Sequence, residues 1–178
     1  MLKAVIKKIL FSFYYKYFKY KFFSAIQNIG TKKLYIFDLD NTIANTWISY
    51  NQSYSSHKSR LDSLSIFIGM KKFISNIDKN NSIVIILTAR EYWYYSLTKK
   101  WIESNELNIN ELIVVSKPYE KILLLKEVMI NCEYYDDMSY NHENNHIIFY
   151  ENEIKAIKSF SNISYYNYDD IKKINGVK

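Results

Sequence analysis

Apolar segments of strand length alternate with segments of helical periodicity from residue 34 towards the C-terminus. We interpret the apolar segments as strands, at 34–37, 83–87, 112–115, 133–135, 146–150 and 163–168. Helical segments are expected at about 61–77, 91–107, 118–131 and 151–160. A chain with this alternation builds a parallel sheet with helices on both faces, because each strand returns to the sheet through a helix. The predicted fold class is therefore α/β, a doubly wound, Rossmann-like sheet.

The charge of the chain divides it into two parts. The 178 residues suit one domain, which we place at 31–178, preceded by a basic segment at 1–30. Eight of the 24 basic residues and none of the 18 acidic ones lie in residues 1–33, which leaves 16 basic against 18 acidic residues for the remainder. The positive excess therefore belongs to the N-terminal segment. Cys132 is the only cysteine, which excludes a disulfide framework and favours a reducing, cytoplasmic compartment.

Residues 1–27 have the pattern of a basic, aromatic helix without acids. Apolar side chains follow helical spacing at first and surround the axis beyond Leu10. The uncharged run at 9–15 is too short to span a bilayer, and no small-residue cleavage site follows it, so a signal peptide is not expected. Two interpretations stay open. The helix binds a membrane interface or an anionic partner, which would make the protein peripheral to the membrane, or it packs on the domain.

Two carboxylates, Asp38 and Asp40, follow the strand at 34–37, and Thr42 comes two positions later. Side chains at i and i+2 point to one face of a strand, so both acids would lie at the carboxyl edge of the sheet, where open α/β sheets bind ligands. Two carboxylates held close together need a cation or a shared proton. They suit a bound Mg²⁺ and a division of labour in which one attacks and the other transfers a proton.

Polar residues of a consistent chemistry follow the next strands as well. Thr88 and Arg90 come after the strand at 83–87, Lys117 after the third strand, and Asp136 with Asp137 after the fourth. Each of them alone is explained as a turn or a helix end. Strand ends on one edge of a parallel sheet converge in space, and together these acids, the hydroxyl and the ammonium are what holding and attacking a phosphoryl group requires.

Between residues 33 and 150 the sequence resembles the haloacid dehalogenase superfamily of phosphohydrolases. Asp38-Leu39-Asp40-Asn41-Thr42 is similar to the first family motif. The resemblance implies that Asp38 is the nucleophile, which forms an aspartyl-phosphate. It also implies that Asp40 protonates the leaving group and then activates water.

The other three family motifs also have counterparts. Thr88 matches the hydroxyl that binds the transferring phosphoryl group, and Lys117 matches the cation that steadies the nucleophile and the phosphate. The fourth motif is similar to the segment that starts at Asp136-Asp137, with Asn141 where the family has a final acid. The resemblance implies a Mg²⁺ site formed by Asp38, Asp40, Asp136 and Asp137.

The assignment of the lysine depends on fine spacing. Lys121 lies one helical turn after Lys117 and is the alternative, but we prefer Lys117 because Lys-Pro at a helix start is the commoner family form. His142 and His146 have the i, i+4 spacing of a metal pair, and we interpret them as flanking a polar loop without binding metal.

The second aspartate implies phosphate-ester hydrolysis in place of dehalogenation. The family inserts its caps in two intervals. Here the first, 42–82, holds mostly one helix and loops, and the second, 88–117, is filled by a helix and a strand. The resemblance therefore implies a minimally capped, open site that accepts a phosphorylated macromolecule or another bulky substrate. Thr88-Ala89-Arg90 is also similar to the polynucleotide 3′-phosphatase branch, so Arg90 and Thr42 are candidate substrate contacts.

The function predicted from these residues is a Mg²⁺-dependent phosphatase that hydrolyses a phosphomonoester through Asp38. The alternative is a catalytically weak binding or scaffolding module of the same fold, held at a membrane or at nucleic acid by residues 1–27. The intact set of acids argues against this alternative, because decay usually removes one of them.

Overall fold

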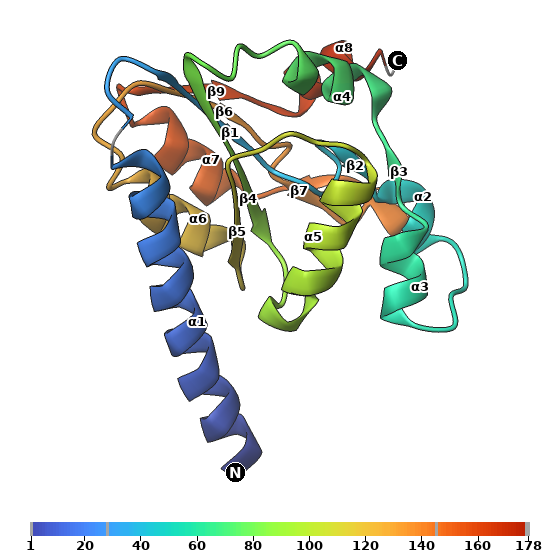
Figure 1. Cartoon of the computed structure of the whole chain (residues 1–178). Helices are drawn as coiled ribbons and strands as arrows, with labels where there is room; N and C mark the ends of the chain where they lie inside the picture. The colour runs from blue at the N-terminus through green and yellow to red at the C-terminus, as the bar shows by residue number, and fades with distance from the viewer. Residues whose placement is uncertain (1, 28, 145, 177–178) are drawn as a thin grey trace.

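A five-stranded parallel sheet lies at the centre of the protein, in a computed structural model that describes residues 2–27, 29–144 and 146–176. The strands follow the order β5-β4-β1-β6-β9 (Figure 1). Their bounds are β1 Lys33–Phe37, β4 Ser82–Ala89, β5 Glu111–Val115, β6 Cys132–Tyr135 and β9 Ile163–Tyr166. All four neighbouring pairs are parallel, so the predicted doubly wound α/β fold is confirmed.

The apolar strand segments form the core because they are covered on both faces. Helices α6 (Pro118–Leu125) and α7 (Glu151–Lys158) pack on one face, and α4 (Ile68–Ser75), α5 (Tyr95–Ser104) and α8 (Tyr168–Asn175) lie on the other (Figure 1). In β4 the run from Val84 to Thr88 is fully buried. A strand buried on both sides reads as a continuous apolar run, which is why β4 was the plainest strand in the sequence.

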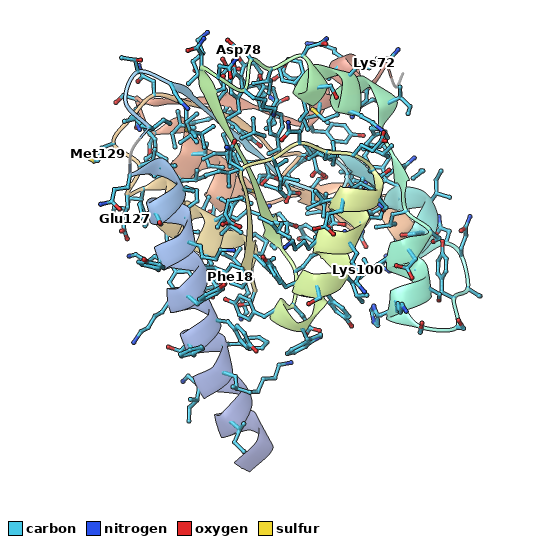
Figure 2. The ribbon with its side chains drawn as sticks, in the orientation of Figure 1. Phe18, Lys72, Asp78, Lys100, Glu127 and Met129 are labelled. Carbon is cyan, nitrogen blue, oxygen red and sulfur yellow. The ribbon has the colours of Figure 1, made fainter. Side chains whose placement is uncertain are left out.

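Helix α1 (Leu2–Ile26) runs along the edge strand β5 in the opposite direction. Near its end, Lys21 Nζ lies 2.8 Å from Oε1 of Glu111, the first residue of β5. Nearer its start, the Phe11 ring lies 5.3 Å from that of Tyr92, which follows the end of β4. Phe18 and Phe22 are buried in the core (Figure 2 labels Phe18). The helix predicted at 1–27 is confirmed over Leu2–Ile26, with Met1 outside the described residues, and its second half packs on the domain.

The first half of α1 extends beyond the rest of the molecule, on the side where the strands end (Figure 1). Within the described ranges, no helix combines the length and the hydropathy needed to cross a membrane.

The interval between β1 and β4 differs from the single helix expected at 61–77. It holds α2 (Trp47–Tyr50), α3 (His57–Asp62) and α4, with a two-stranded antiparallel ribbon of β2 (Ala44–Asn45) and β3 (Ser65–Ile66). The expected helix is broken because Ser65 and Ile66 pair with the chain that follows β1, so the backbone at these positions is extended. This short insertion adds no second domain.

Two further segments correct the sequence interpretation. The segment expected as a sheet strand at 146–150 contributes only β8 (Ile148–Phe149), which pairs antiparallel with β7 (Ser139–Tyr140) outside the central sheet; Asn145 lies outside the described residues. The helix expected at 118–131 ends at Leu125, because the chain must turn to place β6 between β1 and β9. The short 3₁₀ helices η1 (Tyr92–Tyr94) and η2 (His142–Asn144) complete the elements.

Candidate active site

Asp38 and Asp40 lie at the carboxyl edge of the sheet, as their spacing predicted. The backbone N–H of Asp38 donates to Tyr135 O at 2.8 Å, which continues the pairing of β1 with β6. Leu39 between them is buried in the core, so the two carboxyl groups point away from it towards the edge. Asn41 then takes a left-handed backbone conformation (φ 59°), and the chain folds back onto Leu39. Both acids line a cavity of about 410 Å³.

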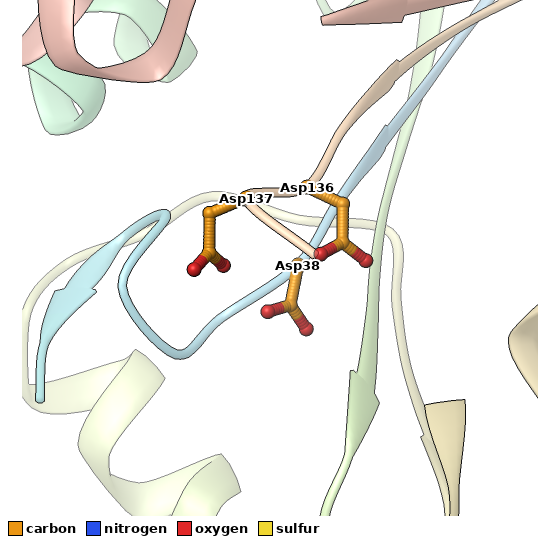
Figure 3. Close-up of side chains that lie close together, drawn as sticks. All are labelled: Asp38, Asp136 and Asp137. Carbon is orange, nitrogen blue, oxygen red and sulfur yellow. The ribbon is translucent and has the colours of Figure 1, made fainter. Parts of the chain in front are cut away.

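Three carboxylates meet in this cavity. Asp38, Asp136 and Asp137 each contribute an oxygen, and these oxygens lie within 4.8 Å of one another. Figure 3 shows the three side chains side by side, with their carboxylates turned to the same side. Thr42 connects the loop after β1 to the loop after β6. Its Oγ1 accepts a hydrogen bond from the Asp137 N–H at 3.3 Å and lies 3.5 Å from Asp137 Oδ1. The structure therefore gives Thr42 the role of a support for Asp137.

The ammonium beside these acids belongs to Lys121, and the preference for Lys117 is wrong. Lys121 Nζ donates to Asp38 Oδ1 and to Asp136 Oδ2, each at 2.7 Å, and the side chain is 4% exposed. Lys117 is exposed and is the residue before the first turn of α6. Because α6 begins at Pro118, the side chain one turn later is the one that reaches the sheet edge.

Arg90 pairs with Asp40. Arg90 Nε lies 2.7 Å from Asp40 Oδ2 and Nη2 lies 2.6 Å from Oδ1, while Nη1 donates to Thr98 at 3.1 Å. Burial opposes ionisation of Asp40, but the Arg90 guanidinium outweighs it and holds the pKa of this carboxyl below its ordinary value. Asp40, predicted as a metal ligand, therefore stands apart from the three clustered acids and keeps its charge through Arg90.

Thr88 lies at the end of β4 with its side chain fully buried. Its hydroxyl has no hydrogen-bond partner within the part of the chain that the structure describes. A buried hydroxyl normally has a partner, so an unsatisfied one calls for an explanation. In the register of the sheet Phe37 pairs with Ile86, so Thr88 stands one residue beyond the level of Asp38.

Two acids of the cluster, Asp38 and Asp137, resist ionisation. Burial, followed by repulsion from Asp136 and Asp40, raises the pKa of Asp38 to about 7 against the attraction of Lys121. Burial and the charges of Asp136 and Asp38 likewise raise the pKa of Asp137 well above its ordinary value. Burial lowers the pKa of Lys121, but Asp136 and Asp38 outweigh this effect and raise it, so the amine stays charged. With all three carboxyl groups ionised, the cluster would carry more negative charge than Lys121 can balance.

Several residues that sequence reasoning missed support the cluster. The Tyr134 hydroxyl donates to the Asp136 carboxylate, and the Ser139 hydroxyl donates to that of Asp137. His142 Nε2 lies 2.9 Å from Ser139 Oγ and 3.8 Å from Asp137 Oδ2, with its ring 4.9 Å from that of Trp47. Tyr134 precedes Asp136 by two positions on β6, a spacing that could have identified it.

Comparisons with known proteins bear on the fold. No protein-family model matches the sequence, and no curated protein matches it significantly. A chain of the Pnkp1/Rnl/Hen1 complex matches 78% of this chain over 47% of its own length, with a TM-score of 0.55 and 16% identity. A chain of the Pnkp1/Rnl/Hen1 RNA repair complex matches 78% over 43% of its length, with a TM-score of 0.52 and 18% identity.

A third structure, the HAD domain of the effector protein Lem4 from Legionella pneumophila (an inactive mutant), matches 77% of this chain and 85% of its own, with a TM-score of 0.44 and 10% identity. This chain spans less than half the length of the first two chains. The match to the first two chains agrees with the predicted α/β fold, and Asp38, Asp136 and Asp137 lie together after β1 and β6.

Proposed function

We propose that the protein is a Mg²⁺-dependent phosphatase that hydrolyses a phosphomonoester through an aspartyl-phosphate on Asp38. The observation that carries the proposal is the Lys121 ammonium, 2.7 Å from both Asp38 and Asp136, beside the Asp137 carboxylate. This arrangement offers a nucleophilic carboxylate, a cation for the phosphate and a group of oxygen ligands in a single cavity.

The three clustered acids fit a divalent cation. All the ligand atoms are carboxylate oxygens, which Mg²⁺ prefers. When ionised, Asp38, Asp136 and Asp137 together carry two charges more than Lys121 balances, and the raised pKa values of Asp38 and Asp137 reflect the cost of burying this excess. In the proposed enzyme Asp38, Asp136 and Asp137 hold Mg²⁺, which neutralises charge on the phosphoryl oxygens.

The residues of the chain then divide the reaction into two steps. An Asp38 carboxylate oxygen attacks phosphorus, the bond from phosphorus to the ester oxygen breaks, and the leaving oxygen takes a proton from Asp40. In the second step Asp40 accepts a proton from water, whose oxygen attacks phosphorus and releases inorganic phosphate and free Asp38. Lys121 and the Thr88 hydroxyl stabilise the phosphoryl oxygens, and this gives Thr88 the partner that it otherwise lacks.

Arg90 links substrate binding to the state of Asp40 in this proposal. The first step needs a proton on Asp40, whereas the Arg90 guanidinium favours the ionised carboxylate. An anionic group of the substrate competes with Asp40 for Arg90, and a guanidinium drawn towards the substrate lets the Asp40 carboxyl hold its proton. Arg90 is thus proposed as a substrate contact, in accordance with the sequence expectation.

The test is phosphate release by wild type and Asp38→Asn, each with Mg²⁺ and with EDTA, while circular dichroism checks that the variant is folded. We expect turnover only for wild type with Mg²⁺, and turnover by folded Asp38→Asn would contradict the mechanism. A folded, metal-binding protein with no activity on any substrate would favour the scaffold alternative.

The substrate panel should include a polynucleotide with a 3′-phosphate. Among the residues that the structure describes, no separate domain covers the site, and Tyr140 and Tyr150, whose rings lie 4.7 Å apart, line the cavity. Exposed aromatic rings are surfaces on which bases stack. The fold matches a chain of the Pnkp1/Rnl/Hen1 RNA repair complex, which adds to this choice. An aryl phosphate, nucleotides and sugar phosphates complete the panel, and the best substrate identifies the class.

A further inference from the structure

Helix α1 has two apolar faces, of which the domain covers one. Phe11, Tyr15, Phe18 and Phe22 lie on the face that packs against the core. Their spacing of four, three and four residues keeps them on one side of the helix. This face accounts for the attachment of α1 to the domain.

The second face is exposed. It consists of Ile6, Ile9, Leu10, Phe13, Tyr17 and Tyr20, here called the α1 stripe, with exposed fractions between 46% and 72%. The spacing of three, four and seven residues aligns these side chains along the helix, away from the packed face. Trp93 of η1 is 50% exposed and lines an apolar cavity beside the start of the stripe with Ile6 and Leu10.

Lysines surround the α1 stripe. Lys7, Lys8 and Lys16 are exposed, Lys19 and Lys21 are partly exposed, and no acid occurs in residues 1–33. The surface therefore combines aliphatic and aromatic side chains with positive charge. A second copy of this chain would bring two acid-free, lysine-bearing helices together, so charge opposes a homodimer through this face.

We propose that the α1 stripe binds the surface of an anionic membrane, with the helix lying in the interface. Ile, Leu and Phe side chains enter the region between head groups and acyl chains, Tyr and Trp rings lie at the level of the head groups, and the lysines meet the anionic lipids. A nucleic acid would satisfy the lysines but would leave Ile6, Ile9 and Leu10 in water, so the aliphatic content of the stripe favours lipid.

The start of the stripe lies at the same end of the molecule as the candidate active site. Lys7 Nζ is 3.5 Å from Glu91, the residue directly after Arg90, and Lys7 also lies over the Trp93 ring at 4.9 Å. A membrane-bound α1 therefore holds the carboxyl edge of the sheet near the lipid surface. This proposal stands on the helix alone and does not depend on phosphatase activity.

The test is co-sedimentation of the full chain with vesicles of neutral phosphatidylcholine and with vesicles that contain about a third phosphatidylglycerol. We expect binding to the anionic vesicles, weakened by salt, and much less to the neutral ones. Phe13→Asp should weaken binding roughly tenfold to a hundredfold, because it removes a large apolar side chain and adds a negative charge. Met129→Asp is the matched control, since Met129 is 89% exposed and outside the stripe (Figure 2), and it should bind as wild type does.

Trp93 provides a second readout from the same vesicles. We expect its fluorescence to shift to shorter wavelength with anionic vesicles and the shift to disappear in Trp93→Phe, because Trp47 and Trp101 are mostly covered. Lack of binding to anionic vesicles, or equal loss in Phe13→Asp and Met129→Asp, would overturn the proposal. A stripe-dependent dimer or nucleic-acid complex without vesicle binding would overturn it as well.

Discussion

Lys121 shows how one ammonium group controls the charge of a buried site. Its Nζ lies between Asp38 and Asp136, and all three side chains are at most 7% exposed. Removing one member of a buried ion pair leaves an uncompensated charge, which costs more than the pair itself contributes. Lys117, one turn earlier in the sequence, is exposed and provides an internal control.

Lys121→Met should therefore lower the free energy of unfolding by roughly 3 kcal/mol at pH 8 and reduce phosphatase activity at least about a hundredfold. Lys117→Met should change the free energy of unfolding by less than about 0.5 kcal/mol and leave turnover nearly unchanged. Urea unfolding and phosphate release measure the two effects. A larger loss of stability and activity in Lys117→Met than in Lys121→Met would show that Lys117 is the lysine of the site.

Arg90 and Asp40 give a prediction with a defined dependence on pH. Because Arg90 lowers the folded-state pKa of Asp40 below its ordinary value of 3.8, the pair stabilises the fold above that pH and loses its effect as pH falls through the folded-state pKa. Arg90→Gln should therefore be less stable than wild type at pH 7, with a smaller difference at pH 3. Urea unfolding at both pH values measures this. An equal difference at both would show that Arg90 acts through packing.

The sequence predicted most of the individual acids but not the residues around them. Asp38, Asp136 and Asp137 could be identified because each follows a recognisable apolar strand. Lys121 could not be separated from Lys117, because the choice depends on the residue at which α6 begins. Tyr134 and His142 have hydrogen-bond partners two and three residues away, and only the packing of the His142 ring against Trp47 depends on tertiary structure.

At the scale of elements, the sequence predicted the strands of the central sheet to within about one or two residues. Buried parallel strands produce continuous apolar runs, and this signal is local. The β2–β3 and β7–β8 ribbons were missed because strands of two residues are too short to show alternation. The full-length apolar pattern of α1 was recognised, and its division into a packed face and an exposed face required the tertiary structure.

The contact between α4 and α8 depends on a glycine. A Cβ added at Gly69 would lie 2.1 Å from the backbone oxygen of Ile174, far inside van der Waals contact, so the helices would have to separate. Gly69→Ala should therefore lower the free energy of unfolding by roughly 1–3 kcal/mol despite the better helix propensity of alanine. Lys72→Ala on the exposed side of α4 is the control and should be nearly neutral. Thermal unfolding of both compares them, and a stabilised Gly69→Ala would show that α8 moves freely.

At the scale of the whole molecule, two groups of charge lie far apart in the sequence, and the first half of α1 brings part of the first group to the end of the fold that holds the second (Figure 1). Residues 1–33 carry eight lysines, of which Lys7, Lys19 and Lys21 have acidic partners, and the body holds three buried acids beside Lys121. Each group therefore has more charge of one sign than its partners of opposite sign. The proposed occupants, an anionic membrane for the first and a divalent cation for the second, follow from this imbalance.

The divalent cation should stabilise the protein in a way that depends on pH. Because burial raises the folded-state pKa of Asp38 from 3.8 to about 7, the metal-free fold binds more protons than the unfolded chain and loses stability as pH rises between those values. Mg²⁺ binds the ionised carboxylates, so its stabilisation should be larger at pH 8 than at pH 5. At about a hundredfold excess over its dissociation constant the gain is roughly 2.7 kcal/mol, or about 5–10 °C in Tm.

Thermal unfolding with Mg²⁺ or EDTA at pH 5 and pH 8 measures this effect, and Asp38→Asn separates its two causes. The variant lacks the buried charge, so without metal it should be more stable than wild type at pH 8, and by a smaller margin at pH 5. With Mg²⁺ it should gain less than wild type, because one oxygen ligand has lost its charge. A Tm shift with Mg²⁺ that is the same at both pH values, or the same in Asp38→Asn, would place the cation elsewhere on the protein. A shift confined to wild type at pH 8 would locate it among the three carboxylates at the ends of β1 and β6.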